Sequence, residues 1–122
     1  VHKRLARIHA ETATLIATWQ PHMLALEDIY CGASFKAAVR IGEARCAVIL
    51  AAEEAQVQVI EYPPARVKSA ICGFGRAAKV QVQHMVKSIL HLSELPDADA
   101  ADALAVAVCH VNTLRYGMKE RQ

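Results

Sequence analysis

Two segments in the first third of the chain differ in their pattern of apolar residues, one with helical spacing and one with a short continuous run. Residues 2–19, HKRLARIHAETATLIATW, place apolar side chains at the three- and four-residue spacing of one helical face. These apolar positions are Leu5, Ile8, Leu15, Ile16 and Trp19. Residues 22–30, HMLALEDIY, are apolar from Met23 as far as Glu27, which is typical of a strand buried in a parallel sheet. Pro21 separates the predicted helix from the predicted strand, because it has no amide hydrogen to donate.

A second helix is predicted over residues 35–55, with Ser34 placed to act as its N-cap. The positions available for packing are Phe35, Ala38, Val39, Cys46, Ile49 and Leu50. Gly42 lies in the middle of this helix, where glycine costs about 1 kcal/mol relative to alanine. Such a glycine is often explained by the close approach of another backbone, so we expect one here.

The second half of the chain reads as one strand followed by three helices. Residues 57–62, VQVIEY, form the predicted strand, and Pro63 with Pro64 opens a short helix that the sequence GFG ends. Residues 76–92 form the next predicted helix. The last one runs from about residue 99 to residue 115, after the loop SELPDAD. We expect the polar tail GMKERQ to fray.

The predicted order is helix, strand, helix, strand, then three helices, in a single α/β domain over residues 1–122. A helix that connects two strands is a crossover, so the two strands should run parallel. Two parallel strands rarely make a stable sheet alone. The chain also begins with Val1 inside a helical pattern. We therefore expect that either further strands are missing upstream or the partner strands come from elsewhere.

Composition narrows the class of protein. With 54% hydrophobic residues among 122, the chain can build a core, and its longest apolar runs are too short to cross a bilayer. No secretory leader is evident, so a cytoplasmic protein without a membrane partner is expected. The four cysteines include no CxxC pair, and we expect buried, reduced thiols.

The net charge is only +2, but it is distributed unevenly. Residues 62–93 contain no Asp or Glu. The Lys and Arg residues of this stretch are Arg66, Lys68, Arg76, Lys79 and Lys87. Four acids then fall within residues 94–102. This arrangement suits a protein that binds a polyanion and places a metal beside it, although a solvated charged face is the commoner explanation of such a pattern.

Three carboxylates stand out in this pattern. Asp99 and Asp102 are spaced to share one face at the start of the last helix, where capping is the simpler explanation. The helix that follows, ALAVAVCHV, is apolar enough to be buried and to hold both acids in place. Glu27 is costly to bury in its apolar strand without a partner, unless it only marks an exposed strand end. Three such oxygen donors favour Mg²⁺ or Mn²⁺, and two of these ions can clamp a phosphodiester.

Two motifs resemble the C-terminal half of the RuvC-type Holliday junction resolvases. They are EYPPARVKSAICGFGRAAKVQVQHMV and LPDADAADALAVAVCH. The segments QPHMLALEDIY and AAVRIGEARCAVILAA resemble the strand and crossover helix that precede them, so the resemblance covers about residues 5–110. It implies a ribonuclease H-like fold that here lacks its first three strands. It also implies a homodimer that nicks four-way DNA junctions in recombination and repair with a divalent metal, beside a branch-migration helicase.

The resemblance also assigns site residues. Glu27, Asp99 and Asp102 correspond to three of four catalytic, metal-binding acids; the fourth, an aspartate on the first strand, has no counterpart in the chain. Lys68 and Lys79 correspond to basic residues that serve DNA binding and catalysis, and Tyr30 corresponds to an aromatic that meets unstacked bases near the junction. Arg76, in the same basic stretch, is also expected to bind DNA. Residues 35–55 correspond to the helix of the dimer contact, which would give Gly42 its close neighbour.

Together these patterns predict a Mg²⁺-dependent, structure-selective DNA endonuclease, a hydrolase that acts on four-way junctions. One alternative is a truncated fragment that binds DNA without cutting it. Another is a ribonuclease H-like nuclease with a different substrate.

Overall fold

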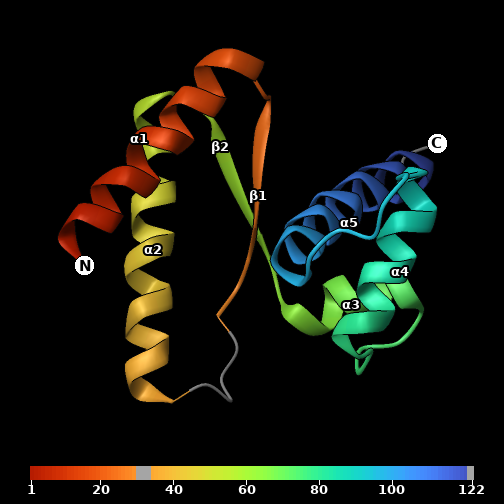
Figure 1. The fold of residues 1–122 in the computed structure, drawn as a ribbon. Helices are drawn as coiled ribbons and strands as arrows, with labels where there is room; N and C mark the ends of the chain where they lie inside the picture. Colours follow the sequence, from red (N-terminus) through yellow and green to blue (C-terminus); the bar gives the residue numbers. More distant parts are fainter. Residues whose placement is uncertain (30–33, 121–122) are drawn as a thin grey trace. The chain divides into compact units, whose positions relative to one another are not determined.

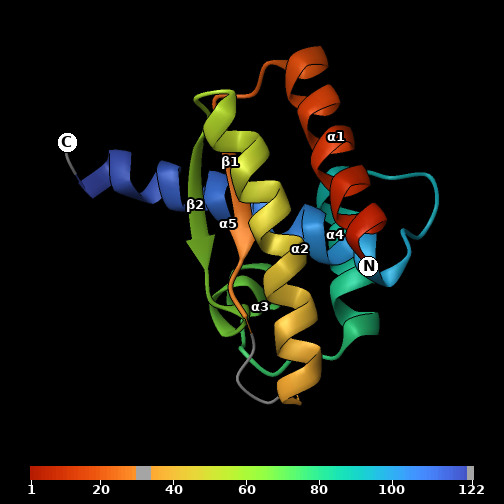
Figure 2. The same ribbon diagram turned by 90° about the vertical axis from the view of Figure 1, so that its left-hand side faces the viewer.

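The computed structural model describes residues 1–29 and 34–120, with side chains as far as Tyr116. Its elements are α1 (His2–Trp19), β1 (Met23–Glu27), α2 (Phe35–Glu54), β2 (Gln58–Tyr62), α3 (Pro64–Cys72), α4 (Lys79–Leu90) and α5 (Ala98–Glu120), as Figure 1 shows. β1 and β2 pair in a two-stranded sheet and run in the same direction in Figures 1 and 2. The predicted order of elements and the parallel pairing are both confirmed.

The chain divides into two compact units. Unit 1 comprises residues 1–24 and 29–61, and unit 2 comprises residues 25–28 and 62–122. Both strands run from one unit into the other, whereas each helix belongs to a single unit.

Unit 1 is built from α1 packed on α2. Its core contains Ile16, Ala52 and Val57, with Leu24 and Val59 packed against them. The predicted apolar face of α1 is only partly correct, because Leu15 and Trp19 are 59% and 77% exposed. α2 meets α1 through small side chains, Ala47, Ala51 and Ala52 among the buried ones, so only a narrow stripe of α1 is covered.

The start of α2 follows the prediction. Ser34 caps the helix, since its Oγ accepts a hydrogen bond from the amide of Ala37 at 3.2 Å. The expected backbone neighbour of Gly42 is not found among the residues that the structure describes. Within this part of the chain, a Cβ built on the glycine would meet Cδ1 of Ile29 at 4.0 Å, an ordinary contact. β1 is also half-buried along its length instead of fully buried, because it pairs with one strand only among the described residues.

Unit 2 is built from α3, α4 and α5, which pack on one another. α3 starts at Pro64 as predicted and ends at Gly73, whose φ of +85° is a conformation that favours glycine. α4 begins at Lys79 instead of the predicted Arg76. The amide of Ala78 donates to Oε1 of Gln81 at 2.8 Å, which fixes the helix start there.

α5 is longer than predicted. It begins at Ala98 and continues through Arg115 and the tail expected to fray, as far as Glu120. Its buried positions are Ala101, Ala105, Val106, Cys109 and His110. No helix among the described residues is long and apolar enough to span a membrane.

The cysteines differ in exposure. Cys109 is buried as predicted, and burial raises the pKa of its thiol. Cys72 is half-buried and Cys46 is exposed, so the expectation of buried thiols was wrong for Cys46. This side chain projects from α2 on a face that α1 does not cover. Cys31 lies outside the described residues.

Candidate active site

Glu27 is the last residue of β1 and is half-buried in unit 2. The amide of the next residue, Asp28, donates to the carbonyl oxygen of Tyr62 at 2.8 Å. Strand pairing therefore continues past Glu27, and it holds the carboxylate at the carboxyl end of the strand. This is the edge at which open α/β folds place ligands.

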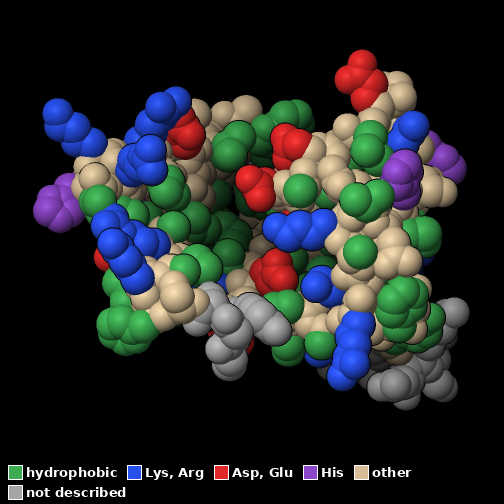
Figure 3. Space-filling model, turned by 60° about the horizontal axis from the view of Figure 1, so that its bottom comes forward, with side chains coloured by type: hydrophobic (Ala, Val, Ile, Leu, Met, Phe, Trp, Pro, Cys, Tyr) green, Lys and Arg blue, Asp and Glu red, His purple; other side chains and the backbone are tan. Residues whose placement is uncertain are grey.

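Charged groups from three helices act on Glu27. Burial raises the pKa of the Glu27 carboxyl, and the carboxylate of Asp102 raises it further. Lys68 and Lys79 lower the pKa in turn. Because these influences fall off with distance, β1, α3, α4 and α5 must bring the four side chains into one neighbourhood. Acidic and basic side chains lie beside one another in the middle and on the right of Figure 3.

The start of α5 is capped by Asp97, from the loop that precedes the helix. Oδ1 of Asp97 accepts a hydrogen bond from the amide of Ala100 at 2.8 Å, and its carbonyl oxygen accepts from Ala101 at 2.9 Å. Capping is therefore the role of Asp97. The helix start therefore does not need Asp99 or Asp102 as a cap. Asp99 is exposed, and Asp102, one turn later, is half-buried.

The first turn of α5 is also held from α4. Nε2 of Gln83 donates to the carbonyl oxygen of Pro96 at 3.0 Å, which ties the preceding loop to that helix. Ala101 and Ala105 have no exposed surface, so α5 approaches its neighbours closely on this side. Asp102 thus projects from a backbone that is fixed by a cap, a loop contact and packing.

The predicted DNA-binding residues occupy different settings. Lys68 is half-buried on α3, between the buried side chains of Val67 and Ile71 along the chain. Lys79 is the first residue of α4, where the helix dipole disfavours a cation. The attraction between the Lys79 ammonium and the carboxylate of Glu27 opposes this unfavourable interaction with the helix dipole. Arg76 is exposed in the loop between α3 and α4, and Tyr30 lies outside the described residues.

The predicted metal ligands are Glu27, Asp99 and Asp102, of which Asp102 acts electrostatically on Glu27. No group of three or more His, Cys, Asp or Glu side chains is arranged to hold a metal ion in residues 1–29 and 34–116. Glu27 and Asp102 nevertheless repel each other across a partly buried space, and a divalent cation between them would relieve that repulsion. Their oxygen donors fit a hard cation such as Mg²⁺ or Mn²⁺ as a pair.

Sequence reasoning missed a buried contact in the same unit. The hydroxyl of Tyr62 and Nδ1 of His110 are 2.6 Å apart, and the side chains are 1% and 8% exposed. This hydrogen bond ties the end of β2 to α5. A histidine inside the run ALAVAVCHV was the available signal, because a buried imidazole needs a partner.

A family model and known proteins similar to this chain point to the same family. The family model described as "Crossover junction endodeoxyribonuclease RuvC" matches residues 1–110. A protein of that name from Halothermothrix orenii is 41% identical over 117 residues, covering 95% of this chain and 71% of the relative. Another from Trichlorobacter lovleyi is 46% identical over 116 residues, covering 95% of this chain and 65% of the relative.

Solved structures agree with these relatives. RuvC from Thermus thermophilus superposes with a TM-score of 0.84 at 40% identity, covering 94% of this chain and 70% of that one. The same protein in complex with a Holliday junction substrate gives a TM-score of 0.87 with the same identity and coverage. The chain thus spans roughly two thirds of the length of these proteins, and the predicted ribonuclease H-like class of fold is confirmed.

Proposed function

Because this chain belongs to the RuvC family of crossover junction endodeoxyribonucleases, we propose that it acts in resolving four-way DNA junctions in recombination and repair. The reaction is metal-dependent hydrolysis of a phosphodiester. The observation that carries the proposal is the convergence of Glu27, Asp102, Lys68 and Lys79 within unit 2.

The acids provide the metal-binding part of the site. Glu27 and Asp102 would hold Mg²⁺ or Mn²⁺, with Asp99 one turn away on α5 as a further donor. A bound divalent cation would lower the pKa of water and neutralise charge on the phosphodiester. The cap on Asp97 and the contact of Gln83 keep the Asp102 backbone in place, so little reorganisation is needed when the substrate binds.

The lysines provide the phosphate-binding part. Lys68 and Lys79 act on the same carboxylate, so a phosphate that approaches Glu27 also approaches two cations. These charges would stabilise the extra negative charge of the transition state. Exposed Arg76 would add a contact to the DNA backbone, and Tyr30 is assigned to unstacked bases near the junction through the family resemblance alone.

A homodimer through α2 is the second part of the proposal. An apolar stripe of α2 is exposed in unit 1; it comprises Phe35, Val39, Cys46 and Leu50. These positions are four, seven and four residues apart, which is the pattern of a helix that packs along another helix. Gly42 falls on the same stripe, where a partner helix could approach its backbone. The family resemblance further suggests work beside a branch-migration helicase in the cytoplasm.

The decisive experiment measures cutting and binding together. The chain is mixed with a labelled four-way junction and Mg²⁺, and nicks are quantified beside a gel-shift titration. Asp102→Asn should reduce the nicking rate by at least about 100-fold and leave junction affinity within about threefold, because it removes a metal donor and no cation. Undiminished nicking by this variant would refute the metal assignment.

A DNA-binding module without nuclease activity is the alternative. It is favoured by the lack of a three-donor cluster among the described side chains. In the same assay, tight junction binding by the unmodified chain with no nicks in Mg²⁺ or Mn²⁺ would select this alternative.

A further inference from the structure

Arg66 on α3 is held against α5 on the side of unit 2 where Tyr62 lies. Its guanidinium lies over the ring of Tyr62, with Cζ 5.2 Å from the ring centroid. One guanidinium N–H donates to Oγ1 of Thr113 at 3.4 Å. The charge of Arg66 also lowers the pKa of the Cys109 thiol, against the larger, opposite effect of burial. Two contacts, one from β2 and one from α5, therefore position the guanidinium of this exposed side chain.

The groups that hold Arg66 are themselves rigid. Tyr62 is hydrogen-bonded to His110, and both side chains are buried. Oγ1 of Thr113 donates to the carbonyl oxygen of Cys109 at 2.8 Å, which fixes the acceptor used by Arg66. A guanidinium positioned in this way loses little conformational entropy when it binds a ligand.

Most of the N–H donors of the Arg66 guanidinium remain available to a ligand. A guanidinium has five N–H donors, and Thr113 accepts from one of them. No ion pair of Arg66 with an Asp or Glu occurs among the residues that the structure describes. A fixed arginine without an acidic partner is the typical centre of an anion site.

Arg66 opens onto a pocket of about 580 Å³ between α3 and the C-terminal half of α5. It is lined by Arg66, Ser69, Ala70, Cys109, Asn112, Thr113 and Tyr116. The lining adds hydroxyl and amide donors to the guanidinium, and none of these described lining residues is acidic. Tyr116, also in the lining, is 67% exposed.

We propose that this pocket binds a backbone phosphate of nucleic acid, with the fork of Arg66 and the side chains of Ser69 and Asn112 as donors. This inference rests on the proposed function, which supplies the nucleic acid. The phosphate is not the one that is cut. Thr113 and Asp102 are eleven residues apart on α5, or about 16 Å along the helix axis at about 1.5 Å per residue.

The first arm of the test uses inorganic phosphate and needs no DNA. Nuclear magnetic resonance follows the Nε–H signal of Arg66 and the side-chain amide of Asn112 during titration. Both signals should shift and saturate with phosphate, whereas acetate should shift them much less. Equal responses to acetate would point to carboxylates of a protein partner and overturn the proposal, as would no response to either anion.

Two variants connect those shifts to the pocket. Arg66→Gln removes the fork, and Ser69→Asp leaves Arg66 in place but adds a competing carboxylate from an exposed position of α3. Each should abolish the response of Asn112. Arg115→Gln is the matched control, because it removes one exposed positive charge from α5 outside the pocket lining, and it should keep the response.

The second arm measures junction affinity against salt concentration. Arg66→Gln should weaken binding about five- to tenfold at low salt and reduce the slope of log K against log[salt] by about 0.9, the value for one phosphate contact. If its slope matched that of the unmodified protein, the pocket would not be a DNA contact. If the unmodified protein bound no junction, the proposed function would fail, while the phosphate arm would still decide the site.

Discussion

Glu27 shows how one residue can be held in an unfavourable electrostatic setting. It is half-buried, it faces a second carboxylate, and two lysines offset part of the cost. Such perturbed carboxyls cluster at sites that bind cations or transfer protons. Its neighbours come from three helices that are far apart in the sequence, so this setting exists only in the folded chain.

Stability should depend on pH through Glu27. Its folded pKa is raised above the ordinary 4.5, so the folded chain binds this proton more tightly than the unfolded chain does. The resulting stabilisation is fully present below pH 4.5 and is lost as pH rises through the folded pKa. Glu27→Gln should flatten this part of the pH profile, measured by urea unfolding in the presence of a chelator. A profile insensitive to Glu27→Gln would contradict this account.

The buried pair of Tyr62 and His110 should contribute measurably to stability. Tyr62→Phe keeps the ring but leaves the imidazole without its partner, which should lower the free energy of unfolding by about 1–3 kcal/mol. Adding His110→Leu to this variant should recover part of the loss, because the unpaired nitrogen is then removed. Urea denaturation of the two single variants and the double variant gives the coupling energy. A coupling energy near zero would show that the hydrogen bond is not formed in solution.

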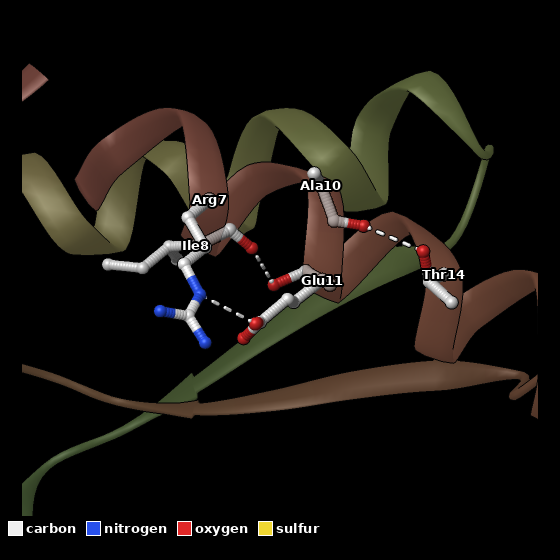
Figure 4. Close-up of polar contacts among 6 residues, drawn as sticks. Arg7, Ile8, Ala10, Glu11 and Thr14 are labelled. Atoms are coloured by element: carbon white, nitrogen blue, oxygen red, sulfur yellow. Dashed lines mark hydrogen bonds and ion pairs between the residues drawn. The ribbon is translucent and has the colours of Figure 1, made fainter. Parts of the chain in front are cut away.

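At the scale of single elements, the helices use different means to stay folded. α1 packs on α2 through Ile16, and its exposed side carries local contacts such as Arg7 Nε to Glu11 Oε1 at 2.9 Å and Thr14 Oγ1 to Ala10 O at 3.0 Å (Figure 4). α5 has few charges over its first half and relies on packing and on its cap. Its start is therefore sensitive to one side chain.

The cap on α5 gives a prediction with an internal control. Asp97→Ala should lower the free energy of unfolding by about 1 kcal/mol, because the amide of Ala100 loses its acceptor. Asp99→Ala should cost less, since the structure gives the capping role to Asp97. Thermal or urea unfolding of the two variants tests the ranking. If Asp99→Ala lowered the free energy of unfolding more than Asp97→Ala, Asp99 would be the capping residue.

For the molecule as a whole, the exposed stripe of α2 has the largest consequence. Phe35 is 86% exposed, and Val39 and Leu50 are 43% and 50% exposed. A stripe of this kind on a helix of 20 residues is unusual for a protein that acts as a single copy. It is the feature by which the proposed homodimer can be tested without DNA.

Disruption of the stripe should change the oligomeric state. Val39→Glu places a charge in the proposed contact and should raise the dissociation constant of the dimer by at least about tenfold. Sedimentation velocity over a range of concentrations measures this shift. Leu114→Glu, at a similarly exposed apolar position of α5, should leave the state unchanged. An unmodified chain that stays monomeric at high concentration would refute the α2 dimer.

The sequence predicted local features well and long-range pairings poorly. Apolar periodicity and the prolines placed every element, because these signals act over a few residues. The cap by Asp97 was missed because three aspartates compete for one helix start, and only geometry selects among them. The bond from Tyr62 to His110 joins residues 48 positions apart, and no periodic pattern encodes such a pairing. Chemistry and resemblance paired Glu27 with Asp102, whereas the effect of Lys68 and Lys79 on the pKa of Glu27 needed coordinates.

The buried imidazole has one more consequence, which concerns how the chain can change during evolution. His110 anchors α5 to β2, and Asp102 lies eight residues earlier on the same helix. One residue inserted between them would turn the carboxylate by about 100° around the helix axis. Exposed Ala103 and Ala107 can therefore be replaced with little penalty, but the number of residues between anchor and carboxylate cannot vary. Descendants of this chain should therefore show substitutions between Asp102 and His110 but no insertions or deletions there.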